Sequence, residues 1–112
     1  SMMEKQEARQ FKALYFDLCT SELKMYYPGK NYLDAYAEIR DYLLKRDFTH
    51  NPWSGYRSAD KMTDLEIFDL MQDLSEAFVW FPKCVEHFEV ANVGTKHNLM
   101  DILKPDISEE QI

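Results

Sequence analysis

The chain has 112 residues, a net charge of −7 and a sequence pI of about 4.9. That length is typical of a single domain, and its 46% hydrophobic and 14% aromatic residues are enough for a core. The acidic balance argues against a broad basic surface for duplex nucleic acid, and no apolar run approaches the roughly 20 residues that span a bilayer. We therefore expect one cytoplasmic domain without membrane contact, with a core at about 11–104 and extensions at 1–10 and 105–112.

The first predicted strand, 12–19, carries an acid inside an apolar run. Successive side chains of a strand point to opposite faces, so Asp17 shares a face with Tyr15 while Phe16 faces the core. A carboxylate in such a strand costs free energy unless it is paired, hydrogen-bonded or open to a cleft. Asp17 therefore either caps a loop or pairs with a cation, or it lies in a cleft and does chemistry.

A loop is expected after this strand, ending in the turn signature Pro28-Gly29. The next segment predicts a helix with Asn31 as N-cap, ending near 46–47. Apolar residues recur there at intervals of three and four, which is typical of a helix with one buried face. That face consists of Tyr32, Ala35, Tyr36, Ile39, Tyr42 and Leu43.

The segment 48–58 predicts a hairpin whose turn is Ser54-Gly55, with Pro52 favouring an edge position. Thr63 and Glu66 have the spacing of a capping box, which predicts the start of a second helix.

Pro82 is expected to end that helix after Trp80-Phe81, two aromatic residues assigned to the core or an interface. The final strand is expected at 83–92, with Val85, His87, Glu89 and Ala91 on one face. A short helix at 98–103 and an acidic tail would follow. Cys19 and Cys84 lack metal-type spacing, so we expect small buried thiols at strand positions in a reducing cytoplasm.

The resulting order, βαββαβ, predicts the ferredoxin-like arrangement of the α+β class: an antiparallel sheet with two helices on one face, plus a short C-terminal extension. The other sheet face would carry Tyr15 and Asp17. A bare face with aromatic residues is usually covered by a partner, most simply a second copy of the chain. We therefore expect a homodimer in which two copies of Asp17 face a shared groove.

Several motifs resemble the virulence-associated protein D (VapD) family over about 12–92. They are Phe16-Asp17-Leu18, Asp34-Ala35-Tyr36-Ala37-Glu38-Ile39-Arg40, Phe48, Ser54-Gly55-Tyr56 and Trp80-Phe81. The family consists of small ferredoxin-like dimers, several tied to toxin–antitoxin modules, and is akin to small CRISPR-associated nucleases with an Asp at the end of strand one. The resemblance implies RNA cleavage and an antitoxin protein as a partner.

The resemblance assigns the catalytic role to Asp17, which matches the strand-one Asp of the family. Arg40 matches the helix-one Arg, and Tyr56 matches the hairpin Tyr. The final strand departs from the family, because Glu86 and Glu89 stand where cations are expected. Anions at those positions would repel RNA.

Other residues have two interpretations from chemistry alone. Arg40 either binds phosphate or pairs with a carboxylate such as Asp17. Ser54 and Tyr56 either contact a phosphate or activate a hydroxyl, or Tyr56 simply packs across the strands. Trp53 and Tyr56 are also suited to stacking on unpaired bases.

Three histidines, His50, His87 and His97, lack ligand spacing and read as surface or hydrogen-bonded residues. His87 is the strongest candidate for acid–base chemistry, because its alternation in the final strand is compatible with the face of Asp17. A single Asp either orients the attacking hydroxyl or helps to hold a divalent cation such as Mg²⁺, and the sequence leaves both open.

The leading hypothesis is therefore an endoribonuclease of the VapD type that acts on single-stranded or loop RNA in a dimer groove, with Asp17 and His87 as catalytic residues. Arg40, Trp53, Ser54 and Tyr56 would bind the substrate. The alternatives are a non-catalytic dimeric interaction module on the same scaffold, and a toxin whose groove is filled by an antitoxin peptide.

Overall fold

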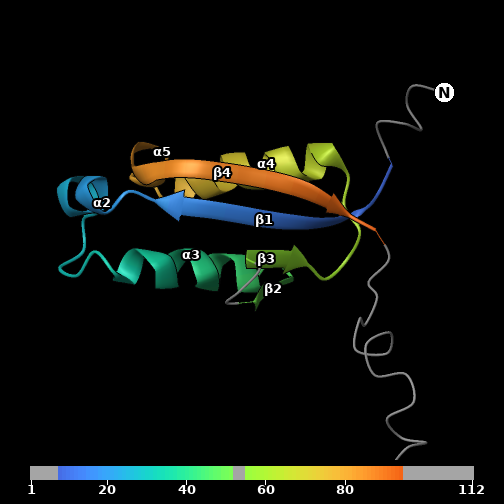
Figure 1. Ribbon diagram of the computed structural model, residues 1–112, viewed down its shortest axis with the longest axis horizontal. Helices are drawn as coiled ribbons and strands as arrows, with labels where there is room; N and C mark the ends of the chain where they lie inside the picture. Colours follow the sequence, from blue (N-terminus) through green and yellow to red (C-terminus); the bar gives the residue numbers. More distant parts are fainter. Residues whose placement is uncertain (1–7, 52–54, 95–112) are drawn as a thin grey trace, which may run out of the picture.

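A computed structural model describes residues 8–51 and 55–94 of the chain (Figure 1). The elements in order are β1 (Phe11–Leu18), α2 (Thr20–Tyr26), α3 (Asp34–Leu44), β2 (Phe48–Asn51), β3 (Gly55–Ser58), α4 (Asp64–Ala77), α5 (Phe81–Cys84) and β4 (Val85–Val93). None of the helices in these residues is long and apolar enough to cross a membrane.

The four strands form one sheet in the order β2-β3-β1-β4, and every neighbouring pair is antiparallel. The connection from β1 to β2 runs through α3, and β3 lies between those two strands. This is the split βαβ arrangement, so the predicted α+β, ferredoxin-like class is confirmed. Figure 1 shows the long pair β1 and β4 lying in front of α4, with α3 following the line of β3.

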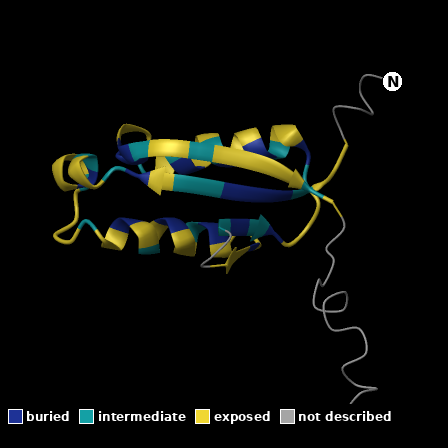
Figure 2. Ribbon diagram, in the orientation of Figure 1, coloured by how far each residue is buried: buried dark blue, intermediate teal, exposed yellow. Residues whose placement is uncertain are grey.

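One side of the sheet is packed and the other is open. Leu14 and Leu18 of β1 join a single buried cluster with Ile39 of α3 and Leu74 of α4. Both long helices therefore cover the face that the alternation predicted. The outer surface of β4 is largely exposed (Figure 2). Trp80 and Phe81 belong to the buried cluster, as expected for a core assignment.

The start of α4 is the predicted capping box. The Thr63 hydroxyl accepts a hydrogen bond from the Glu66 N–H at 3.1 Å, and the Glu66 carboxylate accepts one from the Thr63 N–H at 3.0 Å. These two bonds pair donors that would otherwise lack a partner at the helix end. The start of α3 differs: its N-cap is Leu33, and the Asn31 side chain instead accepts a hydrogen bond from the Leu33 N–H at 3.0 Å. Asn31 thus holds the turn before the helix.

Three expectations about connections were wrong. The segment expected to be a loop contains α2. The first hydrogen bond of this helix runs from the Leu23 N–H to the Cys19 carbonyl oxygen. The second helix ends at Ala77, and Pro82 lies in the first turn of α5. A proline is tolerated there because first-turn N–H groups have no intrahelical partner. Cys19 is the N-cap of α2 and Cys84 is the last residue of α5, so neither lies in a strand, and of the two predicted buried thiols only Cys84 is fully buried.

A β-bulge also changes the predicted faces of β4. Asp17 pairs with His87, but Leu18 pairs with Val85, so the register skips Glu86. The extra residue moves Val85 to the core side of the sheet, where it packs against the buried cluster. The prediction that Val85 shares a face with His87 was therefore wrong.

Lys12 is the one lysine that is buried among the described residues, with 1% of its surface exposed. Its ammonium group donates to Asp64 at the start of α4 and to Asn92 of β4. This contact links the first strand to the second long helix, and the sequence analysis did not predict it.

Some predictions fall outside the described residues. They concern the hairpin turn with Pro52, Trp53 and Ser54, the histidine His97, and the short helix and tail after 94.

Candidate functional site

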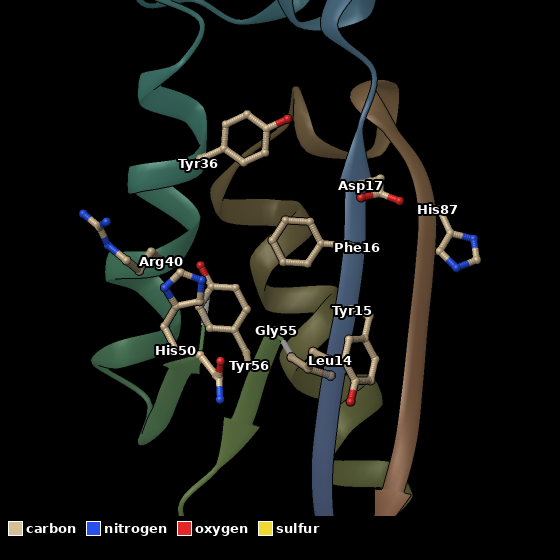
Figure 3. A pocket seen from close by; sticks show the side chains of 11 residues that line it. Leu14, Tyr15, Phe16, Asp17, Tyr36, Arg40, His50, Gly55, Tyr56 and His87 are labelled. Atoms are coloured by element: carbon tan, nitrogen blue, oxygen red, sulfur yellow. The ribbon is translucent and has the colours of Figure 1, made fainter. Parts of the chain in front are cut away.

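A cavity of about 340 Å³ opens between α3 and the C-terminal half of β1 (Figure 3). Its position follows from the unequal lengths of the strands: β3 pairs with β1 only at Ala13 and Leu14, so the edge of β1 beyond them faces α3 instead of another strand. The lining residues are Leu14, Tyr15, Phe16, Asp17, Tyr36, Arg40, His50, Asn51, Gly55, Tyr56 and His87. All four strands and α3 thus contribute to one site.

Gly55 is required where β3 begins. Its φ is +78°, and a Cβ atom built there would lie 2.4 Å from the Leu14 carbonyl oxygen and 3.0 Å from the ring of Tyr15. Only glycine adopts this conformation without strain and permits so close an approach. The sequence analysis predicted Gly55 as part of the hairpin turn. The close contact of Gly55 with β1 forms one edge of the cavity.

Asp17 is exposed on the open side of the sheet, at the end of the cavity nearest α5. Within residues 8–51 and 55–94 it forms no ion pair with an arginine, lysine or histidine. The carboxylate is therefore open to solvent and to a ligand rather than locked to a neighbouring guanidinium. This is the geometry that acid–base or cation-binding chemistry needs.

His87 lies directly opposite Asp17 in β4, on the same face of the sheet. Its Nε2 atom is 3.0 Å from a carboxylate oxygen of Glu89, which lies two residues further along the same face. Figure 3 shows the imidazole turned away from Asp17. The strand register makes the two predicted catalytic residues, Asp17 and His87, direct cross-strand neighbours. The contact with Glu89 keeps the imidazole of His87 away from Asp17.

A row of stacked aromatic rings crosses the sheet, and three of them, His50, Tyr56 and Phe16, line the cavity. His50 lies on Tyr56 with ring centroids 4.5 Å apart, and Tyr56 is stacked with Phe16 at 5.8 Å. Phe16 continues the series to Phe88 at 6.0 Å. Each of the four strands therefore supplies one ring, and His50 is the exposed end of the row.

Tyr36 forms the opposite wall from α3. Figure 3 shows its hydroxyl directed toward β1, on the side where Asp17 lies. Partial burial and the charge of Asp17 raise the pKa of the Tyr36 hydroxyl above its usual value of 10.0. Tyr36 is therefore a neutral hydrogen-bond donor at neutral pH.

Arg40 follows Tyr36 by one turn on the same side of α3. Burial raises the pKa of the Tyr56 hydroxyl, and the positive charge of Arg40 acts in the opposite direction; both residues line the cavity. In Figure 3 the guanidinium points away from β1. The side chain is exposed, and its nearest anionic partner is Asp41, at 3.8 Å.

The structure brings together four of the residues singled out in the sequence: Asp17, Arg40, Tyr56 and His87. Trp53 and Ser54 lie outside the described residues. Tyr36 and His50 are among the lining residues that the sequence analysis did not assign to the site. Tyr36 was assigned to the buried helix face, although its spacing of four from Arg40 is a signal that both share one side of the helix. His50 was read as a surface residue, and nothing in the sequence placed it against Tyr56.

Asp17 is the one carboxylate among the residues that line the cavity. No group of three or more His, Cys, Asp or Glu side chains in the described part of the chain is arranged to hold a metal ion. Mg²⁺ is commonly bound by one or two carboxylates together with water and substrate phosphates. The donor set therefore fits a cation that arrives with a phosphate ligand, with Asp17 as its protein ligand.

No protein-family model matches the chain. A curated relative is Endoribonuclease VapD 2 of Riemerella anatipestifer, which is 25% identical over 88 residues. The matched region covers 79% of this chain and 94% of that protein, so the similarity extends over nearly the whole relative. This comparison supports the resemblance to the VapD family that the motifs indicate, and with it a family of endoribonucleases.

Proposed function

We propose that this protein is an endoribonuclease of the VapD type that cleaves phosphodiesters in single-stranded or loop RNA, with Asp17 as its catalytic residue. The observation that carries the proposal is the position of Asp17: an exposed carboxylate without an ion-pair partner in the described residues, at the mouth of an aromatic cavity. The name of the curated relative supports the reaction class.

Asp17 would accept the proton of the attacking hydroxyl. The oxygen of that hydroxyl forms a bond to phosphorus, the bond from phosphorus to the leaving oxygen breaks, and the leaving oxygen takes a proton. His87, across the strand pair, is the group placed to supply this proton in its charged form once it leaves Glu89. When Mg²⁺ is bound with the substrate, it would neutralise charge on the phosphate oxygens.

Arg40 and Tyr36 would stabilise the phosphate from α3. An arginine offers several N–H donors to phosphate oxygens, and the long exposed side chain of Arg40 reaches toward the cavity after rotation about its own bonds. The neutral hydroxyl of Tyr36 adds a donor next to Asp17, which offsets the repulsion between that carboxylate and the phosphate.

The proposal includes a homodimer and a role as the toxin of a toxin–antitoxin module. The open face of β1 and β4, with Tyr15 and Asp17, is the surface on which a second copy would complete the groove. An antitoxin protein would inhibit the enzyme by filling that groove.

The test is cleavage of an end-labelled single-stranded RNA by the wild type, by Asp17→Asn and by Asp69→Asn, with and without Mg²⁺. Asp69 is an exposed carboxylate of α4 away from the cavity, so its substitution removes the same charge elsewhere. We expect Asp17→Asn to lower the rate by about 100-fold or more, the usual effect of losing a general base, and Asp69→Asn to leave it unchanged. Equal rates for all three proteins would exclude Asp17 from the mechanism, and RNA binding without cleavage would favour the interaction module.

A further inference from the structure

The aromatic part of the cavity has its own geometry, separate from the carboxylate at its mouth. Four rings surround it: Tyr36 from α3, Phe16 from β1, Tyr56 from β3 and His50 from β2. We call this space the aromatic slot. Figure 3 shows the ring of Tyr36 on one side and the paired rings of His50 and Tyr56 on the other, with Phe16 between them.

Only some of these rings have surface left for a ligand. Tyr56 is 6% exposed, because His50 and Phe16 each stack on it. His50 is exposed, and Tyr36 is 41% exposed although it is a large aromatic residue. Both exposed rings line the same cavity, and aromatic surface that is exposed within a cavity is typical of binding sites.

The chemistry around the slot selects a ligand with two different ends. The slot itself offers flat ring surfaces, which suit a planar aromatic group. Its rim carries Arg40 and the hydroxyl of Tyr36, which suit an anion attached to that group. A nucleotide unit of a single strand has both parts, whereas a base inside a duplex has its faces covered by its neighbours.

We propose that the aromatic slot binds one unpaired nucleobase of the RNA, stacked on His50 and enclosed by Tyr36, with the adjoining phosphate directed toward Asp17. This inference rests on the proposed function and names the part of the substrate that fixes the cleavage position. Tyr36 and His50 are positioning residues for the base rather than groups that act on the phosphate.

The experiment measures binding in an Asp17→Asn background, so that the RNA is not cut. The probes are a fluorescein-labelled single-stranded hexaadenylate and a labelled oligomer of the same length in which every base is replaced by an abasic site. Fluorescence anisotropy gives the affinity for each probe. The two probes carry the same phosphates, so their difference reports the bases alone.

We expect the base-bearing probe to bind at least about fivefold more tightly than the abasic one, the lower end of what one stacked base contributes. His50→Ala should remove most of this difference, His50→Phe should retain it, and Tyr36→Ala should reduce it. The matched control is Thr49→Ala, a neighbouring exposed residue of β2 that does not line the cavity, which should change neither affinity.

Equal affinity for the two probes would contradict base binding in the aromatic slot. An equal loss of affinity for both probes in the His50→Ala variant would contradict it too. Neither result depends on catalysis. If the Asp17→Asn variant still cleaves RNA, the catalytic proposal fails, and the anisotropy of the two probes recorded before cleavage still decides the slot. If the base dependence is missing but Asp17→Asn abolishes cleavage, the slot alone is excluded.

Discussion

Asp17 and His87 are cross-strand partners in β1 and β4, and the register of the two strands shifts immediately after them. Without the bulge, Glu86 would pair with Leu18, and its carboxylate would lie on the helix-covered side of the sheet. The bulge places Val85 there instead, so an apolar side chain meets the core while His87 remains beside Asp17. One extra residue thus satisfies both the packing of the core and the composition of the site.

The contact between His87 and Glu89 predicts opposite effects of substituting the two residues. Because Glu89 contacts the imidazole and adds a negative charge to the face that we propose binds RNA, Glu89→Gln should raise the rate of RNA cleavage about two- to fivefold. His87→Ala should lower it by at least about tenfold if the imidazole donates the proton. Initial rates on a labelled single-stranded RNA check both.

Glu86→Gln is the matched control for charge, because it removes an equal negative charge without touching the His87 contact. If Glu86→Gln and Glu89→Gln give the same increase, and the increase disappears at high salt, only the charge matters and the imidazole has no part in the reaction.

Gly55 and Gly94 predict a sharp contrast between two substitutions of the same kind. Gly55→Ala should destabilise the protein by about 1–3 kcal/mol, because the residue has a positive φ and its new methyl group would meet the Leu14 carbonyl. Gly94→Ala should change stability by less than about 0.5 kcal/mol, because nothing lies within 4 Å of the added atom. Urea unfolding of both variants gives the comparison, and similar midpoints would contradict the assigned geometry of the hairpin.

The sequence predicted those features that depend on local periodicity and on short motifs. Alternation in β1 placed Asp17 on the face away from the helices, and the Thr63 to Glu66 spacing identified the start of α4. Both signals act within a few residues, so tertiary packing did not have to be known.

The features that were missed depend on contacts between distant segments. The bulge at Glu86 follows from fitting Val85 against the core, and a strand period of two contains no sign of it. His50 belongs to the site because β2 pairs with β3 and brings its ring onto Tyr56. The pair between Lys12 and Asp64 was not predicted, because the two residues lie far apart in the chain.

Lys12 and Asp64 predict an unequal response to removing either partner. The side chain of Lys12 is 1% exposed and that of Asp64 is 70% exposed, so only the lysine is left in a poor environment when the pair is broken. Asp64→Asn should therefore destabilise the protein by about 1–2 kcal/mol, whereas Lys12→Met should lie within about 1 kcal/mol of the wild type.

A double-variant cycle isolates the interaction from any effect of Asp64 on the start of α4. The Lys12→Met, Asp64→Asn variant should be more stable than the sum of the two single changes allows. Strict additivity in urea unfolding, or a larger loss for Lys12→Met than for Asp64→Asn, would mean that the ion pair does not hold β1 against α4.

The capping box predicts a pH dependence of stability. The hydrogen bond from the Thr63 N–H, together with the nearby Arg9 guanidinium at 2.8 Å, lowers the pKa of the Glu66 carboxyl from its ordinary value of 4.5. A carboxyl whose pKa is lower in the folded state stabilises the fold above its unfolded pKa, and this contribution is lost as the pH falls through the folded pKa.

Glu66→Gln should therefore reduce stability at neutral pH and show a shallower loss of stability between about pH 5 and about pH 3 than the wild type. Glu76→Gln, an exposed position near the other end of α4, should keep the wild-type slope. Because the glutamine still fits the capping geometry, parallel pH profiles for the wild type and Glu66→Gln would show that the hydrogen bonds stabilise α4 without the charge.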